Sequence, residues 1–141
     1  MRWLVAAVMI TLAPMGPAFA EEEAELIGDA ARGETLFRQC RGCHQVGSGA
    51  ENRAGPHLNE VFGRRAGSID GFDYSDAMDR AHGDGLTWDI ATLDAYIENP
   101  RALVSGTRMS FRGIKDPQDR HDVMAYLRQF SASPQNIPES E

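Results

Sequence analysis

Apolar residues recur at helical spacing in the last third of the chain and predict two amphipathic helices. The first begins after Thr87, which can cap it, and ends at Asn99-Pro100; its apolar face consists of Ile90, Leu93, Tyr96 and Ile97. The second opens at Asp116-Pro117, a capping residue followed by proline at the first helical position, and its stripe consists of Val123, Met124, Leu127 and Phe130.

Two further helices are expected earlier in the chain. Asp29 is a good N-cap for a helix that runs to about Gln39. Gly33 lies inside this segment, and since an internal glycine costs about 1 kcal/mol against alanine, it suggests that another helix packs closely there. A shorter helix is expected from Ser75 to His82, and it ends at Gly83.

The segments between these helices lack periodicity, and no strand pattern is found. Residues 45–71 are rich in glycine and aperiodic, and residues 101–113 also lack a period. A long loop is uncommon in a small domain unless it surrounds a ligand. The pattern therefore predicts an all-α fold whose loops wrap a bound group.

The N-terminal segment has the features of a secretory signal peptide. A basic start is followed by an apolar run from Trp3 to Leu12, and Ala18-Phe19-Ala20 is a small-x-small cleavage site. We expect a signal peptide at 1–20, an acidic extension at 21–28, one folded domain at 29–130 and a flexible tail at 131–141. The destination is the bacterial periplasm, although retention of the apolar run as an anchor stays open.

The charge of the chain excludes some partners and is unevenly distributed. Loss of residues 1–20 leaves a net charge of 13 − 21 = −8, so nucleic acid and anionic membranes are poor partners. Two segments, 32–65 and 98–115, are basic, whereas residues 66–97 hold seven Asp and one Arg. A positive ring on a negative body is one interpretation, and ordinary solvated charges are the other.

The run Cys40-Arg41-Gly42-Cys43-His44 carries the strongest chemical signal. Two thiols three positions apart, followed by histidine, form the attachment signature of c-type haem. Each thiol can add to one haem vinyl group while His44 binds the iron. A thioredoxin-like disulfide would need a βαβ pattern, and a zinc site would need further ligands; a structural disulfide is the third alternative.

A methionine is the best candidate for the other face of the iron. Met124 and Met78 lie in predicted helices, where core packing explains them, and His121 lies on a helix face. Met109 lies instead in the loop Ser105-Gly106-Thr107-Arg108-Met109, which offers no helical stripe for it to join. Ligation by His and Met raises the reduction potential and suits reversible electron transfer.

The chain resembles a class I cytochrome c, the branch that includes mitochondrial cytochrome c and its soluble bacterial relatives, over roughly residues 29–130. The matching runs, in order, are Gly33 with Phe37, the Cys40 to His44 motif, Gly55-Pro56-His57-Leu58, Phe62-Gly63-Arg64, Gly71-Phe72-Asp73-Tyr74-Ser75-Asp76-Ala77, Leu86-Thr87-Trp88, Tyr96-Ile97-Glu98-Asn99-Pro100, Gly106-Thr107-Arg108-Met109 and Ala125-Tyr126-Leu127.

This resemblance implies a role for each matching residue. His44 and Met109 would be the axial ligands, Cys40 and Cys43 would hold haem c covalently, and the Pro56 carbonyl would orient His44. One haem propionate would contact Tyr74 and Trp88 with Arg64 nearby as counter-charge, and Thr107 would bind the other. Tyr96 would approach the Met109 sulfur. Gly33 and Phe37 would cross the last helix near Val123 and Tyr126.

The chain also departs from the mitochondrial pattern. Met78 replaces an asparagine that orders an internal water, which implies a simpler polar network, and Asp79 to Gly83 is longer by about three residues. Arg101, Arg108 and Arg112 stand where lysines are usual, and Lys115 is the only lysine of the chain. Arginine keeps the charge and adds bidentate pairing with carboxylates.

Three functions follow as hypotheses. The first is a monomeric periplasmic one-electron carrier that docks to redox proteins with acidic patches, through a rim of Arg38, Arg41, Arg101 and Arg112. The second is a haem peroxidase or ligand sensor with an open iron site, which would need a distal acid or base that spacing does not place. The third is the dedicated electron-accepting subunit of one dehydrogenase.

Overall fold

The computed structural model describes residues 28–132. The predicted signal peptide, most of the acidic extension and most of the C-terminal tail lie outside these residues. Within residues 28–132 the structure contains helices and loops without strands; an isolated bridge pairs Arg65 with Thr87. The predicted all-α fold is confirmed.

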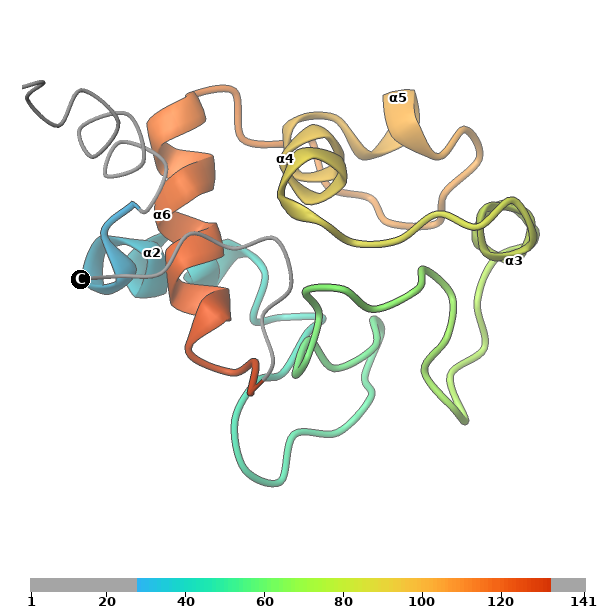
Figure 1. Ribbon diagram of the computed structural model, residues 1–141, viewed down its shortest axis with the longest axis horizontal. Helices are drawn as coiled ribbons and strands as arrows, with labels where there is room; N and C mark the ends of the chain where they lie inside the picture. Colours follow the sequence, from blue (N-terminus) through green and yellow to red (C-terminus); the bar gives the residue numbers. More distant parts are fainter. Residues whose placement is uncertain (1–27, 133–141) are drawn as a thin grey trace, which may run out of the picture.

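The helices follow one another along the chain, and the longest loop, residues 40–75, lies between η1 and α3 (Figure 1). They are α2 (Ala30–Leu36), a 3-10 turn η1 (Phe37–Gln39), α3 (Asp76–Gly83), α4 (Ile90–Glu98), α5 (Pro100–Leu103) and α6 (Pro117–Arg128). No helix in residues 28–132 is long and apolar enough to cross a membrane. The helix predicted from Asp29 to Gln39 is therefore present, but its last turn is tightened to 3-10 geometry.

Side-chain caps explain where most helices begin. Asp29 accepts from the main-chain N–H groups of Ala31 and Arg32, and Asp116 caps α6, both as predicted. Ser75, predicted as the first residue of a short helix, is the N-cap of α3. The predicted cap of α4 was wrong. Asp89, not Thr87, is the N-cap, because Asp89 and Thr92 form a reciprocal capping box.

The short helix α5 was not predicted. Residues 101–113 lack an apolar period, and four residues are too few to show one. The available signal was Pro100, because proline favours the first position of a helix. The helix leads directly into the loop that carries Met109.

Helices α2 and α6 cross in close contact, as the glycine in α2 predicted. A Cβ built on Gly33 would lie 1.8 Å from the main-chain oxygen of Asp122, so only glycine fits. One turn later, the rings of Phe37 and Tyr126 pack with centroids 5.3 Å apart and planes tilted by 48°. The two ends of the domain are thereby joined.

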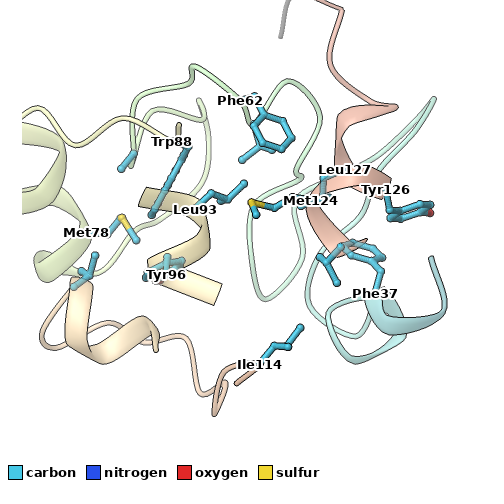
Figure 2. Packing of buried hydrophobic residues seen from close by; sticks show 14 of the residues in the cluster. Phe37, Phe62, Met78, Trp88, Leu93, Tyr96, Ile114, Met124, Tyr126 and Leu127 are labelled. Atoms are coloured by element: carbon cyan, nitrogen blue, oxygen red, sulfur yellow. The ribbon is translucent and has the colours of Figure 1, made fainter. Parts of the chain in front are cut away.

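The hydrophobic core extends from this crossing toward α3 and α4 (Figure 2). Phe37 and Tyr126 lie at one end of the cluster, and Met78, Trp88 and Tyr96 group at the other. Val123, Met124 and Leu127 of the predicted α6 stripe are buried, and Phe130 is half-buried. The core therefore runs between the two regions of chain that carry the predicted ligands.

Candidate haem site

The two cysteines lie in a turn that follows η1. The main-chain N–H groups of Cys43 and His44 both donate to the carbonyl of Cys40, at 3.1 and 3.0 Å. Both cysteines are free thiols; Cys40 is half-buried and Cys43 is exposed. Burial raises the pKa of the Cys40 thiol to about 11, with a smaller contribution from Cys43. The turn thus presents two cysteine sulfurs beside an imidazole.

The imidazole of His44 is fixed by the loop that follows it. Its Nδ1 lies 2.7 Å from the carbonyl oxygen of Pro56, so Nδ1–H donates and Nε2 remains as the free lone pair. Burial lowers the pKa of His44, although the Pro56 hydrogen bond acts in the opposite direction. Gly55 packs against the ring so closely that a Cβ there would lie 2.3 Å from Cε1. The ring is neutral and oriented for metal binding.

Met109 lies on a loop that is tied to its surroundings by main-chain and side-chain contacts. Thr107 N–H donates to the Val104 carbonyl at 3.0 Å, and Met109 N–H donates to Thr107 Oγ1 at 3.3 Å. The hydroxyl groups of Tyr96 and Thr107 are 2.9 Å apart. Met109 itself is half-buried and packs against the core. A thioether is thereby presented from a restrained loop.

Arg64 is a half-buried cation with neutral partners. It donates to the carbonyl oxygens of Asn59 and His57, at 2.8 and 3.2 Å. Within residues 28–132 no carboxylate lies within ion-pair distance of it. Burial lowers the pKa of Arg64, since an uncompensated charge is costly away from water. A carboxylate supplied by a bound group would relieve this cost.

The other residues with expected haem contacts are placed as follows. Trp88 is buried, with its ring 4.9 Å from that of Tyr96. Tyr74 is half-buried, its oxygen accepts from Ile69 N–H at 3.2 Å, and burial raises its pKa. The hydroxyl group of Thr107 hydrogen-bonds to the Tyr96 hydroxyl and accepts from Met109 N–H. Tyr96 therefore meets Thr107 through its hydroxyl, a contact that the sequence did not indicate.

The donor atoms fit haem and do not fit a metal ion held by side chains alone. In residues 28–132 no three His, Cys, Asp or Glu side chains are grouped so as to hold a metal. Haem has an iron, two vinyl groups and two carboxylates on its porphyrin ring. The iron suits the neutral imidazole and the loop thioether, the vinyl groups suit the two thiols, and a carboxylate suits the unpaired guanidinium. The residues present fit the cofactor.

Two contacts near Met109 were not found from the sequence. Arg108 donates to the main-chain carbonyl of Asp73, and Arg108 Nη1 also lies 3.7 Å from the Asp73 carboxylate. Gly106, with φ +89°, brings its backbone against Ala77, whose Cβ would lie 3.4 Å from a Cβ at Gly106. Neither contact has a sequence signal, because each joins residues about 30 positions apart.

The fold and these donors define a c-type haem protein. The cytochrome c family model matches residues 30–131, and the chain belongs to the cytochrome c family. The predicted resemblance is thus confirmed.

Curated relatives and solved structures agree with this family. The chain is 52% identical over 119 residues to cytochrome c2 of Rhodomicrobium vannielii, covering 84% of this chain and 93% of that one. It is 44% identical to cytochrome c2 of Blastochloris viridis, covering 94% and 96%. The structure of cytochrome c2 from Rhodospirillum centenum aligns with a TM-score of 0.70 at 40% identity, covering 74% of this chain and 99% of that one.

Family membership establishes the cofactor and the class of function. Members carry haem c covalently through a Cys-x-x-Cys-His motif, and this chain has its two cysteines at positions 40 and 43. The chain is an electron-transfer protein with haem c and not an enzyme, as predicted. Ligation by histidine and methionine is typical of the family.

Proposed function

We propose that His44 and Met109 are the axial iron ligands of this electron carrier and that Cys40 and Cys43 form its two thioether bonds. The observation that carries the assignment is the 2.7 Å contact between His44 Nδ1 and the Pro56 oxygen, which leaves Nε2 for the iron. Met109 is supported by its restrained loop, whereas Met78 and Met124 are buried core residues on helices.

Haem supplies a one-electron iron couple when it is bound, and the chain's own residues govern its surroundings. Arg64 places an unpaired guanidinium where a propionate needs a counter-charge, and Tyr74 and Trp88 lie in the same region of the fold as further donors. Thr107 hydrogen-bonds to Tyr96 and to the main-chain N–H of Met109, which fixes the chain beside the proposed ligand. Burial also disfavours ionisation of Tyr96, which keeps this side of the site uncharged.

The partners we propose are periplasmic or membrane redox proteins with acidic docking patches. Arg38, Arg41, Arg101 and Arg112 are all exposed, and they come from η1, the haem-attachment turn, α5 and the loop before α6. Long-range attraction raises the encounter rate more than the affinity, so complexes would be short-lived. The protein would act as a monomer after signal cleavage. A dedicated dehydrogenase subunit would use the same rim and differ only in partner.

The ligand assignment is tested by absorption spectra of the ferric protein. The weak near-infrared charge-transfer band of Met-ligated ferric haem should vanish in Met109→Ala and survive in Met78→Ala. Met78→Ala is the matched control because Met78 is also a methionine of the same core. A native protein with a five-coordinate spectrum would overturn the carrier assignment and favour the sensor or peroxidase alternative.

The docking rim is tested by the ionic strength dependence of electron transfer to an acidic redox partner. The second-order rate constant should fall steeply between low salt and physiological salt, since exposed charges are screened over about 8 Å at 0.15 M. Charge reversal at Arg101 should reduce the rate at low salt, whereas reversal at Arg80 on α3 should not. A rate that is indifferent to salt would argue against the rim.

A further inference from the structure

Arg120 is a buried arginine on α6 that contacts three parts of the fold at once. Only 7% of the residue is exposed. Its Nε and Nη2 donate to the two carboxylate oxygens of Asp94 on α4, at 2.7 and 3.2 Å. Its Nη1 donates to the main-chain carbonyls of Ile114 and Lys115, at 3.1 and 3.0 Å. Those two carbonyls belong to the segment that leaves the Met109 loop.

The same segment is held against the end of α4 by independent contacts. Ile114 N–H donates to the Ile97 carbonyl at 2.9 Å, and Lys115 Nζ donates to the Glu98 carbonyl at 2.6 Å. Gly113 is so close that a Cβ would lie 1.9 Å from the Glu98 oxygen. The Met109 loop therefore has a fixed downstream end, and Arg120 is the side chain that ties this end to both α4 and α6.

The upstream end of the loop is held differently. It is joined to the core through Thr107, which contacts Val104 and Tyr96, and through Gly106, which rests on Ala77. Arg108 adds exposed contacts to Asp73, and Met109 N–H donates to Thr107. Between Met109 and Ile114 no main-chain hydrogen bond fixes the described chain, so the position of Met109 also depends on how firmly Ile114 and Lys115 are held.

We propose that Arg120 is a positioning residue for Met109 that acts through the carbonyls of Ile114 and Lys115. This inference rests on the proposed ligation by Met109. A planar guanidinium suits the task because it pairs with Asp94 through one edge and still has an N–H pair for the carbonyls. A lysine could keep the charge near Asp94 but could not reach all of these acceptors. In such a variant the segment after Met109 would separate from α4 and α6 more often, and Met109 would leave the iron more often.

The test uses the ferric holoprotein and imidazole, a neutral ligand that binds the iron only after Met109 leaves it. At saturating imidazole the binding rate equals the rate at which Met109 leaves the iron. This rate is monitored through the loss of the near-infrared band. Global stability is measured in parallel by guanidinium unfolding, followed by far-ultraviolet circular dichroism. Arg120→Lys is compared with Arg32→Lys, a matched control because Arg32 also pairs with aspartates of α6 but touches no part of the Met109 loop.

We expect Arg120→Lys to raise the rate of Met109 release, measured at saturating imidazole, about tenfold, the size expected when one or two hydrogen bonds from a charged donor are lost. Arg32→Lys should change it less than about twofold, since Arg32 makes no contact with the Met109 loop and distant sites act independently. Asp94→Asn, which keeps the Arg120 carbonyl contacts, should give a smaller increase and serves if Arg120→Lys does not fold. Equal rates in Arg120→Lys and Arg32→Lys, or an increase that matches the loss of global stability, would overturn the inference. Absence of the band in the native protein would instead overturn the ligand assignment.

Discussion

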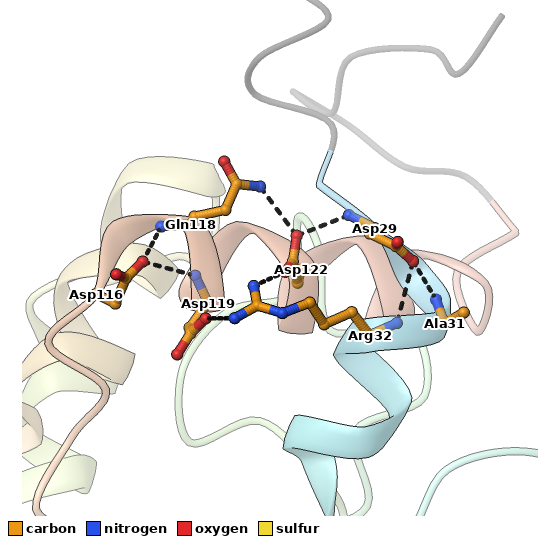
Figure 3. Close-up of polar contacts among 7 residues, drawn as sticks. All are labelled: Asp29, Ala31, Arg32, Asp116, Gln118, Asp119 and Asp122. Atoms are coloured by element: carbon orange, nitrogen blue, oxygen red, sulfur yellow. Dashed lines mark hydrogen bonds and ion pairs between the residues drawn. The ribbon is translucent and has the colours of Figure 1, made fainter.

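Asp122 on α6 accepts a hydrogen bond of 2.7 Å from the main-chain N–H of Asp29, the residue that caps α2 (Figure 3). Its carboxylate also accepts from Gln118 Nε2 at 2.9 Å and from Arg32, which bridges to Asp119 as well. One buried carboxylate therefore fastens the start of α2 to the middle of α6.

Loss of this carboxylate should weaken the α2–α6 crossing. We expect Asp122→Ala to lower the free energy of unfolding by about 1–3 kcal/mol, because several hydrogen bonds to one buried charged group are removed. Asp119→Asn is the matched control: it also pairs with Arg32 but is more exposed, and its loss should cost less than about 1 kcal/mol. Guanidinium unfolding of both holoproteins measures the difference.

The contribution of Asp122 should also disappear in acid. Burial alone would raise its pKa, but hydrogen bonds from Asp29, Gln118 and Arg32 hold the pKa below the ordinary value. An acid with a depressed folded pKa adds stability above its unfolded pKa, about 4, and this stability is lost as the pH falls through the folded pKa. The gap in unfolding free energy between the native protein and Asp122→Asn should therefore shrink below pH 4. A gap that is constant from pH 7 to pH 3 contradicts this.

Gly33→Ala should be the most damaging single methyl addition at the helix crossing. The new Cβ would overlap the Asp122 main-chain oxygen, so α2 and α6 would have to separate, at a cost of more than about 3 kcal/mol. Gly83→Ala is the control, because Gly83 lies at the end of α3 with nothing within 4 Å of its Cβ. It should gain about 0.5–1 kcal/mol through reduced entropy of the unfolded chain. Thermal unfolding of the two variants should move in opposite directions.

Gly55→Ala should disturb the proximal histidine specifically. A Cβ there would lie 2.3 Å from Cε1 and 2.7 Å from Nδ1 of His44, so the ring must rotate and its bond to the Pro56 carbonyl must lengthen. The reduction potential and the ferric spectrum should change, because that bond sets the basicity of the ligand. Gly42→Ala, whose Cβ meets nothing within 4 Å, should leave both readouts unchanged. Identical potentials in the two variants would refute the role of Gly55.

Tyr96 should make the protein less stable in strong alkali. Burial raises its pKa, partly offset by the hydrogen bond with Thr107. The folded protein holds the Tyr96 proton more tightly than the unfolded chain does. The stability that the protonated hydroxyl contributes is therefore complete below pH 10 and is lost as the pH rises through the folded pKa. Tyr96→Phe should cost about 1 kcal/mol at pH 7, from the lost hydrogen bond, and that deficit should narrow above pH 10. Unfolding measured from pH 7 to pH 11 checks the narrowing.

Much of the fold could be predicted because its signals are local. Asp29, Ser75 and Asp116 cap the helices that follow them, and capping depends on residues within one turn. Thr87 was chosen wrongly because two capping residues lie close together, and only the reciprocal contact of Asp89 with Thr92 decides between them. Pro100 was a signal for α5 that its short length concealed.

The sequence by itself determined the attachment motif, the helices that begin at local caps, and the glycine at which two helices meet, since each depends on neighbouring residues or on a missing side chain. The tertiary structure alone decided the contacts of Asp122 with Asp29, of Arg120 with the segment after Met109, and of Arg108 with Asp73. The reason is physical. Hydrogen bonds between distant residues depend on where helices and loops come to lie, and no spacing along the chain encodes which carbonyl a buried arginine will reach.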